Sequence, residues 1–161
     1  MQLSKNFTLE EMLWSQTAYQ KGIKNEPKDQ ETEKVISNLK ALCTYVLQPT
    51  RDHFGPLTVT SGYSCLALAT ILGRKPNSQH VFGEAVDIVS SKISNLEIAD
   101  WISRNIDFDQ LIYECRYRKG TRIKYDWVHV SYKKDGGNRN QVLYSPPSGG
   151  YLYGLPKKSL V

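Results

Sequence analysis

Residues 77–88, NSQHVFGEAVDI, place His80 seven residues ahead of Asp87, with Gly83 between the two side chains. The first half is polar and contains turn-forming residues, whereas the second half has the apolar character of a buried strand. The stretch alone fits either a metal site or a loop that runs into a strand. The choice depends on what the rest of the chain can place beside His80 and Asp87.

The N-terminal part of the chain predicts helices. Thr8 and Glu11 have the spacing of a capping box and predict a short helix that ends near Gly22. Residues 29–55 carry apolar side chains at helical spacing and predict the longest helix, which Pro49 should kink or divide.

Strands prevail in the second half of the chain. Short apolar or alternating runs between turn residues predict strands at residues 56–62, 84–90, 109–115, 125–133 and 140–145. Two short helices are expected at residues 64–73 and 94–106, and Ser94 and Glu97 repeat the capping-box spacing. This order predicts an α+β fold: a single domain with N-terminal helices packed against a small, largely antiparallel sheet. We expect the domain to span residues 1–145 and an irregular C-terminal tail to span residues 146–161.

Length and composition are those of an ordinary globular domain, with 161 residues, 40% hydrophobic and 23% charged. No apolar run reaches the roughly 20 residues that cross a bilayer, and the first residues lack the pattern of a signal peptide. We therefore expect cytoplasmic synthesis and no membrane insertion. The net charge of +5 favours an anionic partner, but because no nucleic-acid motif is found we expect no nucleic-acid binding.

The three histidines can be weighed one by one. His53 lies near the end of the long predicted helix, where a histidine interacts favourably with the helix C-terminus. His80 lies in a polar turn, and His129 lies inside an apolar predicted strand, WVHVS, where a polar ring needs a partner. His80, His129 and Asp87 together supply two imidazoles and one carboxylate. This is the ligand set of a catalytic zinc site that leaves its fourth position to water. A hydrogen-bonded core histidine is the alternative for His129.

Four blocks stand in a characteristic order: TSGY (60–63), SQHVFGEAVDI (78–88), FDQLIYE (108–114) and DWVHVSY (126–132). Together they resemble the M15 family of zinc peptidases. The likeness is to its small phage and bacterial members, which are related to D-alanyl-D-alanine carboxypeptidases and L-alanyl-D-glutamate endopeptidases. It runs from residue 3 to about residue 145.

The resemblance implies both a site and an activity. In the family the corresponding histidines and aspartate bind zinc, which implies that His80, Asp87 and His129 hold Zn²⁺. The family's acid/base carboxylate lies just before the last histidine, which implies Asp126. The expected reaction is zinc-dependent hydrolysis of peptide bonds in the stem peptides of bacterial peptidoglycan, in which a carboxylate base assists a metal-activated water.

The position of Asp126 is in tension with strand geometry. Side chains alternate along a regular strand, so Asp126 and His129 should face opposite sides. Asp126 reaches the metal only if the strand begins after it or is bulged there. Otherwise Glu114, at the end of FDQLIYE, is the alternative base.

The sequence departs from the family pattern at two positions. Ser64 stands where relatives commonly have an arginine, and Ala69 stands where an asparagine is common. Arg74, or an arginine of residues 116–122, could fold back to replace the lost guanidinium. The departure also leaves open a second function, a non-catalytic zinc-containing module that binds the cell wall.

Four further residues are candidates to line the site or support its ligands: Ser61, Tyr63, Ser78 and Trp127. Turn formation or core packing is the alternative for each of them. We expect a monomer whose partner is peptidoglycan. It would act at the cell wall after release, as a phage lysis enzyme (an endolysin) or a virion-associated enzyme.

Overall fold

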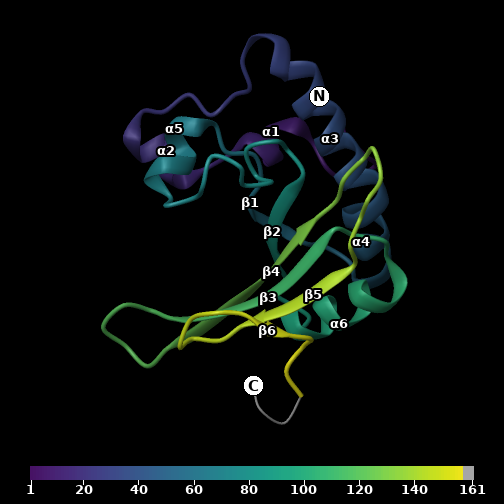
Figure 1. Cartoon of the computed structure of the whole chain (residues 1–161), viewed down its shortest axis with the longest axis vertical. Coiled ribbons are helices and arrows are strands. Elements are labelled where there is room, and N and C mark those ends of the chain that lie inside the picture. The colour runs from purple at the N-terminus through teal and green to yellow at the C-terminus, as the bar shows by residue number, and fades with distance from the viewer. Residues whose placement is uncertain (158–161) are drawn as a thin grey trace.

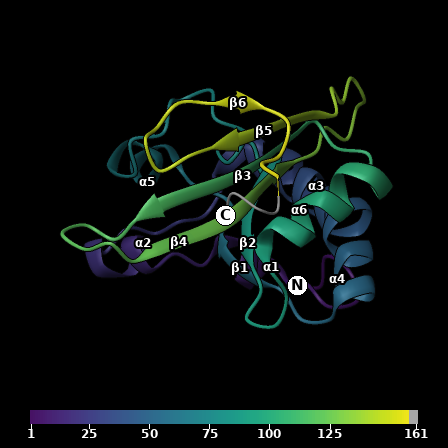
Figure 2. The same cartoon turned by 90° about the horizontal axis from the view of Figure 1, so that it is seen from below.

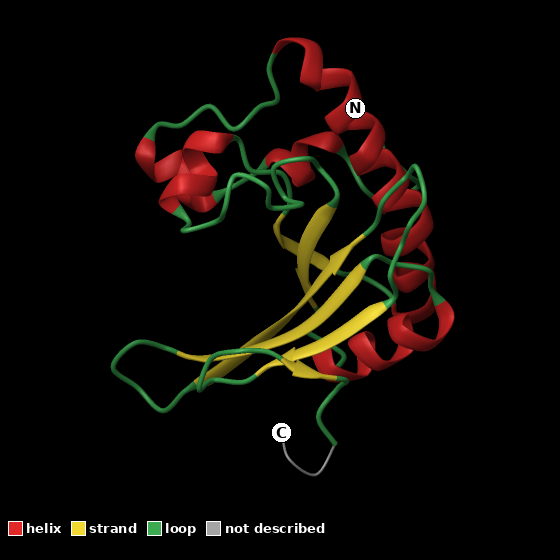
Figure 3. Cartoon of the chain, in the orientation of Figure 1, coloured by secondary structure: helices red, strands yellow, loops and turns green. Residues whose placement is uncertain are grey.

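The computed structural model describes residues 1–157 and confirms the α+β class. Within these residues, six strands form one open sheet in the order β1-β2-β4-β3-β5-β6 (Figure 1; Figure 3). The strands are β1 (Thr58–Ser61), β2 (Ala85–Val89), β3 (Gln110–Tyr117), β4 (Lys124–Ser131), β5 (Gln141–Ser145) and β6 (Leu152–Tyr153). Only β3 and β5 pair in parallel, so among the described strands the sheet is largely antiparallel, as predicted.

The helices lie in two places relative to the sheet. They are α1 (Leu9–Leu13), α2 (Gln16–Lys21), α3 (Thr32–Leu42), α4 (Gln48–Phe54), α5 (Leu66–Ile71) and α6 (Asn95–Asn105). A 3-10 turn precedes α3, and the π-helical turn Cys43–Leu47 joins α3 to α4. Helices α3, α4 and α6 pack along one side of the molecule, and α2 and α5 lie on the other (Figure 1; Figure 2).

Local signals at the helix ends were mostly correct. Thr8 and Glu11 form the predicted capping box at the start of α1. Pro49 lies in the first turn of α4, directly after the π-helical turn, so the long predicted helix is divided near it. The cap predicted at Ser94 is wrong: its side chain makes no cap bond, and the side chain of Asn95 instead accepts a hydrogen bond from the loop before α6.

Strands β3 and β4 have two different faces. One face packs against α3 and α6 in the core, and its members are Leu111, Tyr113, Cys115, Val128 and Val130. The other face carries Ile112 and Glu114 on β3 and Trp127 and His129 on β4. The register pairs Glu114 with Trp127 and Ile112 with His129, so these four side chains form one wall of a cleft.

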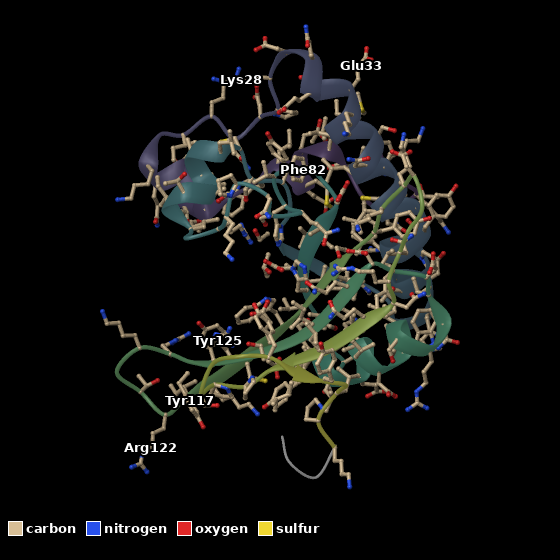
Figure 4. All side chains as sticks on the ribbon, in the orientation of Figure 1. Lys28, Glu33, Phe82, Tyr117, Arg122 and Tyr125 are labelled. Atoms are coloured by element: carbon tan, nitrogen blue, oxygen red, sulfur yellow. The ribbon has the colours of Figure 1, made fainter. Side chains whose placement is uncertain are left out.

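The connection between β3 and β4, which form a hairpin, is shorter than the predicted strands imply. Because β3 continues to Tyr117 and β4 begins at Lys124, the connecting loop shortens to residues 118–123. The hairpin projects from the body of the molecule, with Tyr117 and Arg122 near its end (Figure 4).

The segment after β5 is mainly irregular as far as residue 157, but it adds the short strand β6 along β5. The remainder of the predicted tail, residues 158–161, lies outside the described part of the chain. Among the described helices, none is long and apolar enough to cross a membrane.

Candidate metal centre

Three side chains predicted as ligands meet at one point. His80, Asp87 and His129 form a group that could hold a metal ion. Nε2 of His80 lies 3.3 Å from Nδ1 of His129. Oδ1 of Asp87 lies 2.9 Å from Nδ1 of His129 and 3.4 Å from Nε2 of His80. We call this arrangement the ligand triangle.

The sheet and one tight loop assemble the ligand triangle. Asp87 and His129 are directly paired in the β2–β4 register, so their side chains are neighbours on one face. His80 comes from the loop before β2, and Gly83 in that loop has a φ of 71°. A Cβ at Gly83 would lie 2.8 Å from the carbonyl oxygen of Val35 in α3. Glycine therefore allows the loop to pass close to α3 and bring His80 to the two strands.

Hydrogen bonds and burial set the protonation of two of the ligands. Nδ1 of His80 lies 2.8 Å from the carbonyl oxygen of Gly62 and donates to it, so the lone pair of Nε2 faces the triangle. Burial lowers the pKa of His80 and favours the neutral ring. Burial alone would raise the pKa of Asp87, but the adjacent His80 and His129 outweigh burial and hold it well below its usual range. Neutral imidazole and ionised carboxylate are the forms that bind a metal.

The geometry of the ligand triangle fits a tetrahedral ion. Ligand atoms about 2.0–2.2 Å from Zn²⁺ at tetrahedral angles lie roughly 3.3 Å apart. The observed separations of 2.9, 3.3 and 3.4 Å bracket that value. Three protein ligands leave one position open, and the triangle borders a cleft of about 700 Å³. The arrangement therefore matches an open site of the catalytic kind.

Asp126 does not belong to this cleft. Its Oδ1 accepts from the side-chain amide of Asn95 at 2.6 Å, and its Oδ2 accepts from the hydroxyl of Tyr113 at 2.6 Å. Because β4 is already paired with β3 from Lys124 onward, positions 126 and 129 face opposite sides of the sheet. The placement of Asp126 beside the metal, expected from the resemblance, is thus corrected: its carboxylate lies on the face covered by helices.

Glu114, the alternative carboxylate, does lie in the cleft with the ligand triangle. Its side chain is 15% exposed, and its Oε2 lies 3.1 Å from Nη2 of Arg116. Burial raises the pKa of Glu114 and the negative charge of Asp87 adds to this effect, against the lowering by His129 and Arg116. A carboxyl group with a raised pKa beside a metal site is suited to accept a proton and return it.

Arg74 places a guanidinium at the ligand triangle. Its Nη2 donates to Oδ2 of Asp87 at 3.0 Å and to Oγ of Ser61 at 3.1 Å. Its Nη1 donates to Oγ of Ser64 at 2.9 Å. Of the arginines considered as substitutes from the sequence, Arg74 is the one bonded to Asp87.

The remaining predicted residues are divided between cleft and core. Ser78 and Trp127 line the cleft. Tyr63 does not, because its side chain is buried in the core and borders a separate pocket. His53 stacks on Trp101 with ring centroids 4.5 Å apart, which agrees with a structural role.

Three further residues that bear charge or an aromatic ring line the cleft: Lys75, which was not a candidate from the sequence, Arg116, which belongs to the segment offered as a source of a substitute arginine, and Tyr151 in the predicted tail. Arg116 has the same strand parity as Glu114, and that parity could have singled it out among the arginines of its segment. Lys75 follows Arg74 in a loop, and Tyr151 reaches the cleft from the segment after β5. Neither carries a periodic signal.

A family model described as peptidase M15 matches residues 5–131. The match spans the ligand triangle, Arg74 and Glu114. No curated protein matches the chain.

Proposed function

Because the chain belongs to the peptidase M15 family, whose members hydrolyse peptide bonds with the help of a metal, we propose that it is a zinc peptidase of bacterial peptidoglycan. Membership confirms the resemblance found in the sequence and makes the chain a metallopeptidase. The observation that carries the proposal is the ligand triangle of His80, Asp87 and His129 in a cleft that also holds Glu114.

Zinc is the metal that this donor set suits best. Two imidazole nitrogens and one carboxylate oxygen, with one position open, are a common ligand set of catalytic zinc. When bound, zinc supplies Lewis acidity and lowers the pKa of a water ligand to about 7. The carbonyl of Gly62 keeps His80 in the tautomer that presents Nε2 to the ion.

Glu114 is the residue that we assign to proton transfer. It would accept a proton from the attacking water and deliver it to the amine as the peptide C–N bond breaks. Burial raises the pKa of Glu114 toward the pH at which the enzyme would work. Nη2 of Arg116 lies 3.1 Å from Oε2 of Glu114 and holds it in place. Asp126 takes no part in this scheme, because its carboxylate is committed to Tyr113 and Asn95 on the other face of the sheet.

The walls of the cleft support an anionic peptide as substrate. Arg74, Lys75 and Arg116 contribute positive charge, while Trp127 and Tyr151 contribute aromatic surface. Stem peptides of peptidoglycan carry free carboxylates, which these cations can bind. We propose cleavage of the carboxypeptidase or the endopeptidase type, at the wall, by a phage lysis or virion-associated enzyme.

The test is hydrolysis of purified walls. Protein loaded with one equivalent of zinc should release new amino termini from peptidoglycan, and a chelator should stop the release. Mass spectrometry then separates the two types: free D-alanine indicates a carboxypeptidase, and exposed D-glutamyl amino termini indicate an endopeptidase. No release from several wall types at high concentration of the zinc-loaded protein would refute the proposal.

The second candidate is a non-catalytic wall-binding module with a bound metal. The observation in its favour is Ser64, a neutral residue where the resemblance leads us to expect an arginine. Sedimentation with insoluble walls, without any release of amino termini, would support this function instead.

A further inference from the structure

We propose that Arg74 is a positioning residue of the metal centre, and that its guanidinium occupies the place which a side chain from position 64 could otherwise fill. The part of this inference that concerns turnover rests on the proposed function. The part that concerns Asp87 and the stability of the metal-free site does not.

A helix-ending turn delivers Arg74 to the site. The amide of Gly73 donates to the carbonyl of Thr70 at 3.1 Å, and the amide of Arg74 donates to the carbonyl of Ala69 at 2.8 Å. With Gly73 at a φ of 70°, these two bonds form a Schellman motif at the end of α5. The backbone of Arg74 is therefore fixed, and its side chain starts from a defined point.

The guanidinium then joins three polar groups that come from separate segments. It donates to Ser61 at the end of β1, to Ser64 before α5, and to Asp87 in β2. Three of the five N–H groups of an arginine are used in these contacts. The side chain of Arg74 is 18% exposed, so most of its surface is enclosed by these partners and their neighbours.

The charge of Arg74 determines how Asp87 presents its two oxygens. Oδ2 accepts from Arg74 at 3.0 Å, and Oδ1 lies in the ligand triangle, 2.9 Å from Nδ1 of His129. Asp87 is 8% exposed, so its ionised form depends on protein partners instead of water. Without Arg74 the carboxylate of Asp87 would lose its arginine partner and the hydrogen bond to Oδ2, the oxygen on the side away from the ligand triangle.

Position 64 is next to the same point in space. Ser64 is 0% exposed, and its Oγ lies 2.9 Å from Nη1 of Arg74. Its amide donates to the carbonyl of His80 at 3.1 Å, which fixes its backbone beside a ligand. A small residue at 64 leaves the space that the guanidinium of Arg74 fills. An arginine at position 64 with a small residue at position 74 would place a guanidinium in the same space from the opposite position.

The experiment moves the arginine from one position to the other. Arg74→Ala, the double variant Ser64→Arg/Arg74→Ala, and the control Arg104→Ala are compared with the wild type, first by thermal melting without metal. Arg104 forms an exposed i,i+4 ion pair with Asp100, so its variant measures the loss of an ordinary arginine. Arg74→Ala should lower the melting temperature by roughly 5–15 °C, because a buried charge loses its partner. Arg104→Ala should change it by about 1 °C or less.

The double variant is the decisive sample. It should recover at least half of the lost melting temperature. With saturating zinc it should also recover most of the turnover that Arg74→Ala loses, a loss of roughly 10–100-fold. If Arg74→Ala does not fold, a folded double variant still supports the proposal. The proposal is overturned if Arg74→Ala melts like the wild type, or if the double variant is no better than Arg74→Ala. Absence of cleavage by every protein, wild type included, with the melting pattern as expected, would refute only the proposed function.

Discussion

The side chain of Asp126 connects β4 to α6 and to β3 instead of serving the metal centre. The hydroxyl of Tyr113 and the side-chain amide of Asn95 each donate to it at 2.6 Å. Tyr113 is 0% exposed, so water cannot replace the carboxylate of Asp126 as the hydrogen-bond acceptor of its hydroxyl. Loss of a charged acceptor from a buried donor destabilises the folded state more than loss of a surface contact.

Asp126→Ala should therefore lower the free energy of unfolding by about 2 kcal/mol. Urea denaturation of the metal-free protein measures this change. Asp135→Ala is the matched control, because Asp135 is exposed and pairs only with the neighbouring Lys134 among the described residues. A loss at Asp126 no larger than that at Asp135 would show that the bonds to Tyr113 and Asn95 contribute little.

At the residue scale the sequence predicted the members of the ligand triangle but left the base open. Residue type and block order were enough to select His80, Asp87 and His129. The choice between Asp126 and Glu114 depended on where β4 begins, because one step along a strand reverses the direction of a side chain. The contact between Arg74 and Asp87 depends on the turn at Gly73 that ends α5. The spacing of side chains in the sequence does not show in which direction the chain leaves such a turn.

At the scale of elements, Asp109 fixes the segment that leads into β5. Its side chain is 0% exposed, and Arg139 donates to it from Nε at 2.9 Å and from Nη2 at 2.7 Å. Lys133 adds an ion pair at 3.3 Å. Burial alone would raise the pKa of Asp109, but Arg139 and Lys133 outweigh burial and lower it.

Asp109→Asn should reduce the free energy of unfolding at pH 7 by about 2 kcal/mol, a value below that of a fully buried pair because both cations are partly exposed. A lowered folded-state pKa contributes stability above the unfolded pKa of about 3.9, and that stability is lost as pH falls through the folded pKa. The difference between wild type and variant should therefore shrink below about pH 4. Urea titrations at several pH values measure it, and a difference that does not change with pH would contradict the role of the charge.

Strands were easier to predict than their ends. The alternating and apolar runs located β1 to β5, and the helical spacing located α3 and α6. Strand β3 continues past its predicted end at residue 115 because cross-strand pairing includes the polar residues Arg116 and Tyr117. Strand β6 is two residues long and forms only by pairing with β5. Its residues carry no local pattern from which a strand could be predicted.

At the scale of the whole molecule, positive charge is concentrated on the projecting hairpin. Between Glu114 and Asp126 the chain has five basic residues and no acidic one: Arg116, Arg118, Lys119, Arg122 and Lys124. Apart from Arg116, none of these five forms an ion pair within the described structure. Arg116 of this hairpin lines the cleft, so under the proposed function the hairpin would hold an anionic wall polymer close to the candidate metal centre.

Replacing Lys119 and Arg122 by glutamine should weaken binding to walls that carry anionic polymers several-fold at low salt, and the difference should vanish near 0.5 M NaCl. Co-sedimentation with isolated walls measures the binding. A pair of glutamines at Lys34 and Lys40, exposed on α3, removes the same charge elsewhere. Equal weakening by both pairs would mean that net charge, and not the hairpin, attracts the wall.

The fold class followed from the order of helices and strands, but the order of strands in the sheet did not. The parallel pairing of β3 with β5 requires the chain to cross from β4 to the far side of β3. Nothing in the local pattern of either strand specifies that crossing, because it depends on packing across the whole sheet.

The central claim is that the ligand triangle and Glu114 together form a hydrolytic site. Glu114→Gln and Asp126→Asn, both loaded with one equivalent of zinc, test it by the rate of release of amino termini from peptidoglycan. Glu114→Gln should lose roughly 10²–10⁴-fold in rate while still binding zinc. Asp126→Asn should stay within a few-fold of the wild type. The opposite ranking, with Asp126→Asn inactive and Glu114→Gln active, would contradict the account.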